Sequence, residues 1–112
     1  MLQSDEDQVL GFDNPAAKRL FDAAATTRKI HLNLLNAGHY NATDACLLLP
    51  PWFDPGFSGC DGSMVDPAIA NRIVAGYMTA FFKSTLAGDA RYDEYLEENH
   101  FEGRVVVSTT WN

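Results

Sequence analysis

The sequence predicts a small protein of the α/β class, in which helices flank a partial parallel sheet. Three patterns predict it: apolar residues at helical spacing in residues 14–25, alternating polarity in residues 29–35, and a longer helical pattern in residues 66–88. A strand between two helices is typical of layered α/β folds. The length of 112 residues favours one domain over residues 1–112.

The first helix and the strand that follows it have clear local signals. Asn14 is a candidate N-cap and Pro15 suits the first helical position, so we expect a short amphipathic helix over residues 14–25. Apolar residues at every second position of residues 29–35 predict a strand. Its buried face is formed by Ile30, Leu32 and Leu34.

The longest helix is expected in the second half of the chain. Asp66 and Pro67 give it a cap and a proline start, and Gly88 closes it, so that it covers residues 66–88. Before it, residues 50–62 are rich in proline and glycine and carry three aromatic residues. We therefore expect a packed loop at that point.

The remaining elements are expected to be short, and the sheet therefore has few strands. Residues 1–3 are expected to end a first strand, residues 90–99 to form a short helix, and residues 105–108 a final strand. A sheet with so few strands leaves backbone groups unpaired at its edges. Either the chain pairs with a second copy or partner, or it is part of a larger sheet.

The charge and hydropathy of the chain exclude several classes of protein. The chain has eight basic and fifteen acidic residues, which gives a formal net charge of -7, and no basic run exceeds two residues. We therefore expect no nucleic-acid-binding surface. No apolar run approaches the roughly 20 residues that span a bilayer. The first seven residues lack the features of a secretory signal, and localisation is left open. No cofactor and no metal site are predicted.

His39 is the best-placed candidate for chemistry. It lies in residues 36–40, directly after the predicted strand, and functional groups collect at the carboxyl ends of strands in open α/β sheets. A histidine at such a place can act as a general base if a carboxylate orients it. The alternative is a loop histidine that hydrogen-bonds to nearby backbone.

The candidate carboxylate lies in the acidic run of residues 4–10, after the strand expected at residues 1–3. Asp7 would then lie near the same rim of the sheet as His39. Spacing alone does not select Asp7 over Asp5, and a run of acidic residues is also typical of a solvated turn. The residues by themselves leave both alternatives open.

The order of three segments resembles the last third of the α/β-hydrolase superfamily. They are residues 4–10, a helix that contains residues 17–21, and an alternating strand that ends in Gly38-His39. Residues 69–89 resemble the closing helix of the superfamily's secreted esterase branch. That branch includes dienelactone-hydrolase-like and platelet-activating-factor-acetylhydrolase-like enzymes, and the resemblance covers about residues 1–96.

The resemblance implies that Asp7 is the triad acid and His39 the general base of a carboxylic-ester hydrolase. The family's nucleophile elbow, G-x-S-x-G, should precede the acid, and nothing before Asp7 can hold it. Ser58 and Ser63 follow the histidine and lie in no elbow, and Ser4 replaces the usual turn glycine. We therefore expect a hydrolase-like segment that is inactive without the missing N-terminal part of a hydrolase.

The alternative function belongs to a different class of protein. The chain would be a free-standing, non-catalytic α/β protein that self-associates as a homodimer or binds a partner. An uncovered sheet edge and an apolar helix face favour this alternative, because both need cover.

Cys46 and Cys60 flank the proline-rich loop and allow two interpretations. A disulfide between them would close a loop of about fifteen residues and contribute roughly 3 kcal/mol to stability. The enzymes that the chain resembles often carry such a bond. The other interpretation is a pair of buried thiols. Neither cysteine belongs to a C-x-x-C pair, so a structural zinc site is not expected.

Overall fold

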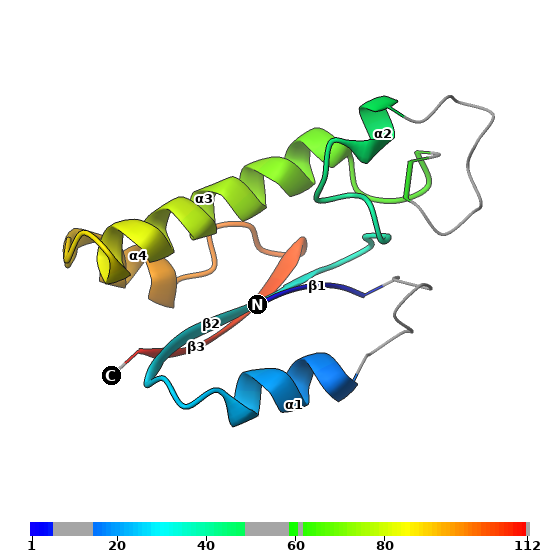
Figure 1. Ribbon diagram of the computed structural model, residues 1–112. Coiled ribbons are helices and arrows are strands. Elements are labelled where there is room, and N and C mark those ends of the chain that lie inside the picture. Colours follow the sequence, from blue (N-terminus) through cyan, green and yellow to red (C-terminus); the bar gives the residue numbers. More distant parts are fainter. Residues whose placement is uncertain (6–14, 49–58, 61, 112) are drawn as a thin grey trace.

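The computed structural model describes residues 1–5, 15–48, 59–60 and 62–111 of the chain. Its elements are, in order, β1 (Leu2–Ser4), α1 (Pro15–Ala23), β2 (Arg28–Leu34), α2 (Ala45–Leu48), α3 (Pro67–Thr85), α4 (Arg91–Glu97) and β3 (Val105–Trp111). α3 and α4 lie on one face of the sheet and α1 lies on the other (Figure 1). Helices therefore flank a sheet, as the sequence predicts.

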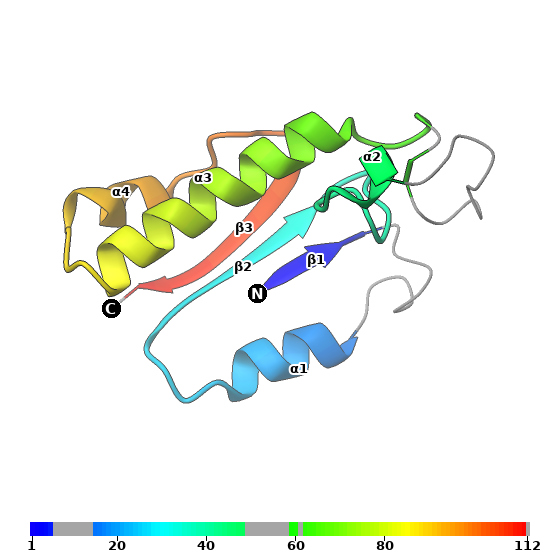
Figure 2. The same cartoon turned by 45° about the horizontal axis from the view of Figure 1, so that its top comes forward.

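The sheet of the described residues is mixed and has three strands in the order β1-β2-β3 (Figure 2). β1 runs parallel to β2, with Leu2 opposite Leu32. β3 runs antiparallel to β2, with Val105 opposite Leu34. The prediction of a parallel sheet is therefore correct for β1 and β2 and wrong for β3.

The direction of β3 follows from the path of the chain after α4. Asp93 of α4 contacts Arg28, which begins β2. At the opposite end of β2, the carbonyl of Arg104 accepts a hydrogen bond from the Leu35 N–H at 2.9 Å. The connection between α4 and β3 thus leads to the carboxyl end of β2. A strand that begins there beside β2 can only run back along it.

β1, α1 and β2 form a parallel crossover unit, in which the helix joins two neighbouring strands. β1 ends at Ser4, one residue later than the strand end expected at residues 1–3, and α1 lies within the helix expected at residues 14–25. Because the two strands are parallel, their carboxyl ends meet at the same rim of the sheet. This rim carries the candidate site.

The core lies between the sheet and α3. Alternate residues of β2 are buried, because a strand presents every second side chain to the same face. The Tyr77 hydroxyl of α3 donates to the Glu98 carbonyl at 2.8 Å and accepts from the His100 N–H at 3.1 Å, so this buried ring keeps its polar atom paired. The buried apolar residues are Ile30, Leu32, Leu34, Ala37, Ala70, Ile73, Val74, Tyr77, Ala80, Leu96 and Val105.

α3 begins where the sequence predicts. The Asp66 side chain accepts a hydrogen bond from the Ala68 N–H at 2.7 Å, and Pro67 takes the first helical position. Gly88, with a φ of 67°, lies just beyond the helix and supplies a left-handed conformation that few other residues adopt readily. The four-residue helix α2 was not expected, because so short a helix has no apolar period to show.

A polar contact joins β2, α3 and α4 at the end of the sheet far from the rim. Arg28 Nη2 donates to Ser84 Oγ at 2.6 Å and to Asp93 Oδ1 at 2.7 Å. Ser84 Oγ donates to the same Asp93 oxygen. Ser84 is buried, so the three groups satisfy one another where little water reaches. The Arg28 contact therefore holds the last turns of α3 against the start of β2.

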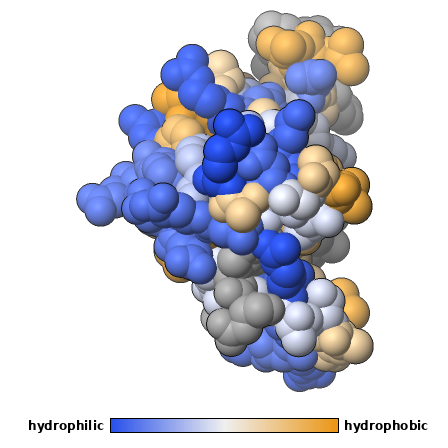
Figure 3. Space-filling model, turned by 90° about the vertical axis from the view of Figure 1, so that its left-hand side faces the viewer, coloured by the Kyte–Doolittle hydropathy of each residue, from blue (hydrophilic) through white to orange (hydrophobic). Residues whose placement is uncertain are grey.

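The surface at this end of the molecule is mainly hydrophilic, with apolar residues in small separate groups (Figure 3). In the part of the chain that the structure describes, no helix is both long and apolar enough to cross a membrane.

We expect Leu34→Ala to lower the free energy of unfolding by about 3 kcal/mol, because it leaves a cavity in a close-packed core. Leu34 is 1% exposed and lies on the central strand. Leu20→Ala on α1 is the matched control, because Leu20 is 67% exposed and should cost less than about 0.5 kcal/mol. Urea unfolding of both variants measures the difference. Equal losses would show that the core is not where the structure places it.

Candidate functional site

The rim at the carboxyl ends of β1 and β2 is held together by Asp5. Its N–H donates to the Leu34 carbonyl at 3.0 Å, which continues the strand pairing by one residue. Its carboxylate Oδ1 accepts a hydrogen bond from the Ala37 N–H at 3.1 Å. Asp5 therefore joins the segment that follows β1 to the turn that follows β2.

His39 lies in that turn, half-buried, two residues beyond the Asp5 contact. The turn begins at Asn36, which has a φ of 52°, a left-handed conformation that asparagine tolerates better than most residues. The His39 ring packs edge-on against the Tyr40 ring, with 4.8 Å between their centroids. The prediction that places His39 just after the carboxyl end of a parallel strand is therefore confirmed.

Asn41 closes the same turn and is fully buried. Its Oδ1 accepts from the Gly38 N–H at 2.5 Å. Its Nδ2 donates to the Gly59 carbonyl at 3.1 Å and to the Val65 carbonyl at 2.7 Å. This role of Asn41 was not predicted from the sequence, where the residue is recognisable only as part of the triplet at residues 41–43.

The burial of Asn41 also bears on a glycosylation pattern in the sequence. Residues 41–43 match the acceptor pattern for N-glycosylation. In the folded chain the Asn41 amide nitrogen donates two hydrogen bonds to backbone carbonyls and is not accessible to a modifying enzyme. The match is therefore not a glycosylation site of the folded chain.

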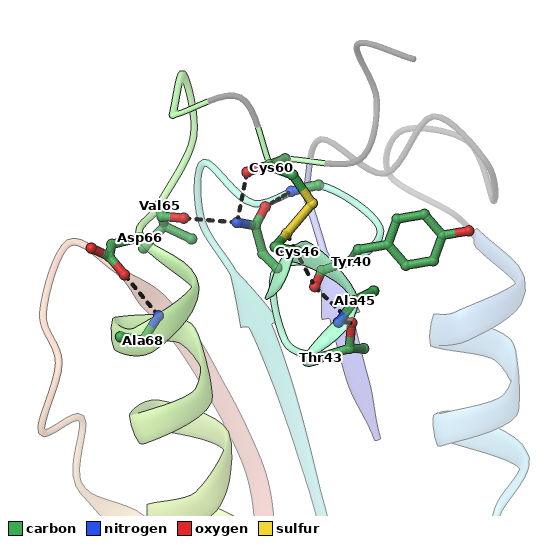
Figure 4. The surroundings of a disulfide bond; sticks show 11 residues. Tyr40, Thr43, Ala45, Cys46, Cys60, Val65, Asp66 and Ala68 are labelled. Atoms are coloured by element: carbon green, nitrogen blue, oxygen red, sulfur yellow. Dashed lines mark hydrogen bonds between the residues drawn. A yellow bond between two sulfur atoms is a disulfide. The ribbon is translucent and has the colours of Figure 1, made fainter. Parts of the chain in front are cut away.

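Cys46 and Cys60 form a disulfide beside this turn (Figure 4). Cys46 lies in α2, and Cys60 directly follows Gly59, which Asn41 contacts. Thr43 supports α2, because its hydroxyl accepts from the Ala45 N–H at 3.1 Å and donates to the Tyr40 carbonyl at 2.9 Å. The His39 turn is thus bordered by a covalent link and by hydrogen bonds.

Two of the residues that the sequence analysis singled out lie outside the described residues. They are Asp7, the expected triad acid, and Ser58, one of the two serines considered as a nucleophile. Ser63, the other serine, is exposed in the segment before α3. Asp5, the alternative acid, is described, and its carboxylate binds the backbone of Ala37.

His31 is on a different surface from His39. Its ring hydrogen-bonds to Gln3 Oε1 at 3.1 Å and packs against the Phe21 ring of α1, with 5.6 Å between centroids. Burial, and then the ammonium groups of the N-terminus and Lys18, lower the pKa of His31, while Asp22 has an opposing effect. His31 therefore contributes to α1 packing. Within the described ranges, no three metal-ligating side chains come together.

A groove of about 410 Å³ runs beside β1, between α1 and α3. Its walls are mostly apolar, and His39 does not line it. The side chains that are also substantially exposed are Met1, Leu2, Leu20, Met78 and Phe82. The groove follows the outer edge of β1, with which no described strand pairs.

Comparisons with known proteins do not assign the chain to a family. No family model matches the chain, and neither a curated protein nor a solved structure matches it. Function is therefore inferred from the residues at the rim.

We expect reduction of the Cys46–Cys60 disulfide to lower the free energy of unfolding by about 3 kcal/mol, because the reduced chain gains loop entropy when unfolded. Urea unfolding with and without dithiothreitol measures this. The matched control combines Cys46→Ala with Cys60→Ala, and its stability should not respond to the reductant. A wild-type chain that is equally stable in both conditions would contradict the expectation.

Proposed function

We propose that this chain is the carboxyl-terminal part of a carboxylic-ester hydrolase, in which His39 is the general base and Asp7 the acid that orients it. The observation that carries the proposal is the parallel β1–α1–β2 unit. Its two strands end at one rim, where Asp5 and Ala37 are in contact. The segments that carry Asp7 and His39 therefore begin side by side.

The proposal gives the two acidic residues different roles. The Asp5 carboxylate is engaged by the Ala37 N–H, and it fixes the start of the turn in which His39 lies. This contact occupies only one of the two carboxylate oxygens, so it does not by itself choose between Asp5 and Asp7 as the partner of the imidazole. Asp7, two residues farther along the chain, is the acid that the hydrolase resemblance assigns to the histidine.

In the proposed reaction, a serine hydroxyl attacks the ester carbonyl while His39 accepts its proton, and His39 later returns that proton to the leaving alcohol. Asp7 accepts the hydrogen bond of the Nδ1–H group, which fixes the tautomer and stabilises the imidazolium. In this proposal, the serine comes from a segment outside these 112 residues. Acid and base have no nucleophile to activate without it, so the chain alone is inactive.

We expect the neutral His39 ring to carry its proton on Nδ1 in the wild-type chain, because a hydrogen bond to Asp7 selects that tautomer. Two-bond proton–nitrogen correlation spectra at about pH 9, where an ordinary histidine is neutral, identify the tautomer. Asp7→Asn should shift the ring toward the Nε2–H tautomer.

The matched control for this measurement is Asp5→Asn, which keeps an oxygen acceptor for the Ala37 N–H. It should leave the His39 tautomer unchanged. A response to Asp5→Asn and none to Asp7→Asn would mean that Asp5 is the acid. No response to either would show that the histidine has no acidic partner here, and the hydrolase proposal would be wrong.

A second candidate function is self-association through the open edge of β1. In a parallel pair, alternate residues direct their peptide groups to the neighbouring strand, and here Met1 and Asp5 direct theirs to β2. The peptide groups of Leu2 and Ser4 therefore face away from β2. A second copy related by a two-fold axis could pair its own β1 with this edge, and the apolar groove beside it would be covered at the same time.

If the edge of β1 forms a dimer, Leu2→Lys should weaken it at least tenfold, because the two-fold axis brings two added charges together at an apolar edge. Leu47→Lys is the control, since Leu47 is 82% exposed on α2 and does not line the groove beside β1. Sedimentation equilibrium over micromolar concentrations measures the association. A wild-type chain that sediments only at 12.4 kDa would exclude this candidate.

A further inference from the structure

Asn41 uses the whole hydrogen-bonding capacity of its amide nitrogen inside the protein. An amide group has two N–H donors, and in Asn41 they bind two backbone carbonyls, those of Gly59 and Val65. The amide oxygen accepts from the Gly38 N–H. Buried polar groups are costly unless they are paired, so an amide at 0% exposure whose nitrogen and oxygen are both hydrogen-bonded is a strong local constraint.

The three partners of Asn41 come from three segments that border His39. Gly38 directly precedes the histidine. Gly59 directly precedes Cys60 of the disulfide. Val65 leads into α3, and its N–H donates to the Asn36 carbonyl at 2.7 Å, at the start of the turn. Figure 4 shows dashed hydrogen bonds that converge between Val65 and the disulfide.

The side chain of Asn41 closes the turn more tightly than the backbone does. The backbone contact between the Asn41 N–H and the Gly38 carbonyl is 3.4 Å long. The side-chain contact from the Gly38 N–H to Asn41 Oδ1 is 2.5 Å long. His39 lies between these two residues in sequence, so the Asn41 amide fixes the stretch of backbone that carries the imidazole.

The environment of Asn41 is also sterically specific. Gly59 has a φ of 80°, and a Cβ atom added to it would lie 1.8 Å from Asn41 Oδ1. Gly62 has a similar φ of 84°, but a Cβ atom added there would meet nothing within 4 Å. An alanine at either position strains the backbone in the same way, and only the one at position 59 displaces the amide.

We infer that Asn41 is a positioning residue for His39: it holds the turn so that the imidazole keeps a fixed direction at the rim. This inference rests on the proposed function, because it gives the direction of His39 a role in catalysis. The direction of the His39 imidazole then depends on α3 and on the segment around the disulfide, and not only on the acidic residue after β1.

The experiment compares Asn41→Ala and Gly59→Ala with Gly62→Ala as the matched control. One readout is the ring-current shift that the Tyr40 ring imposes on His39 protons, since the two rings are in contact. A second is the His39 tautomer at about pH 9, where an ordinary histidine is neutral. Circular dichroism establishes that each variant is folded before it is measured.

We expect Asn41→Ala and Gly59→Ala to abolish the ring-current shift and to move the tautomer toward that of Asp7→Asn. Exchange of the Gly38 N–H with solvent should become at least tenfold faster, because its acceptor is lost or displaced. Gly62→Ala should leave all three measurements unchanged. If Asn41→Ala does not fold, the comparison of Gly59→Ala with Gly62→Ala tests the inference by the same measurements.

An unchanged ring-current shift in a folded Asn41→Ala or Gly59→Ala chain would overturn the inference, whatever happens to the tautomer. If neither Asp7→Asn nor Asp5→Asn changes the His39 tautomer, the proposed function fails. The ring-current shift still decides whether Asn41 holds His39. The two failures are therefore distinguishable.

Discussion

The pairing of β2 with a strand on each side is the constraint on which the other elements depend. Its backbone groups are used by β1 on one edge and by β3 on the other. Its apolar face, with Leu34 fully buried, gives α3 a surface to cover. Because β2 is fixed in this way, the turn that leaves its carboxyl end has a defined starting point.

The candidate site lies in the turn that leaves the carboxyl end of β2. Asp5 secures the turn on the β1 side and Asn41 secures it on the α3 side, so the segment that carries His39 is held from two directions. Preorganisation of this kind is what a general base requires, because a small misplacement of a reacting group costs much of its catalytic effect.

Local sequence patterns were sufficient to predict much of the fold. The alternation of Ile30, Leu32 and Leu34 located β2 and its buried face, and Asp66 with Pro67 located the start of α3. Both signals act within a few residues of the backbone that they specify. The direction of β3 could not be predicted, because it depends on where the connection from α4 delivers the chain, which no short pattern encodes.

The candidate site was less accessible to prediction for a similar reason. The place of His39 after a strand is a local property, and it was predicted. The contact of Asp5 with Ala37 joins residues 32 positions apart, and the contact of Asn41 with Val65 joins residues 24 positions apart. Such pairings arise only after the sheet and α3 are assembled, and residues 41–43 on their own match a glycosylation pattern instead.

The two faces of the sheet differ in how firmly their helices are attached. α3 is joined to β2 by the core and by the Arg28 contact, whereas α1 is attached mainly through the Phe21 and His31 rings and through Lys29 Nζ, which donates to the Phe21 carbonyl at 2.7 Å.

Regions with fewer buried contacts open at lower free energy, so α1 belongs to a less stable cooperative unit than β2, β3 and α3. His39 is tied by Asn41 to the stable unit, while Asp7 belongs in sequence to the segment between β1 and α1. In the proposed pair, His39 would therefore come from the more stable unit, and Asp7 from the segment that leads to α1. A pairing between them would make the docking of α1 a condition for a working site.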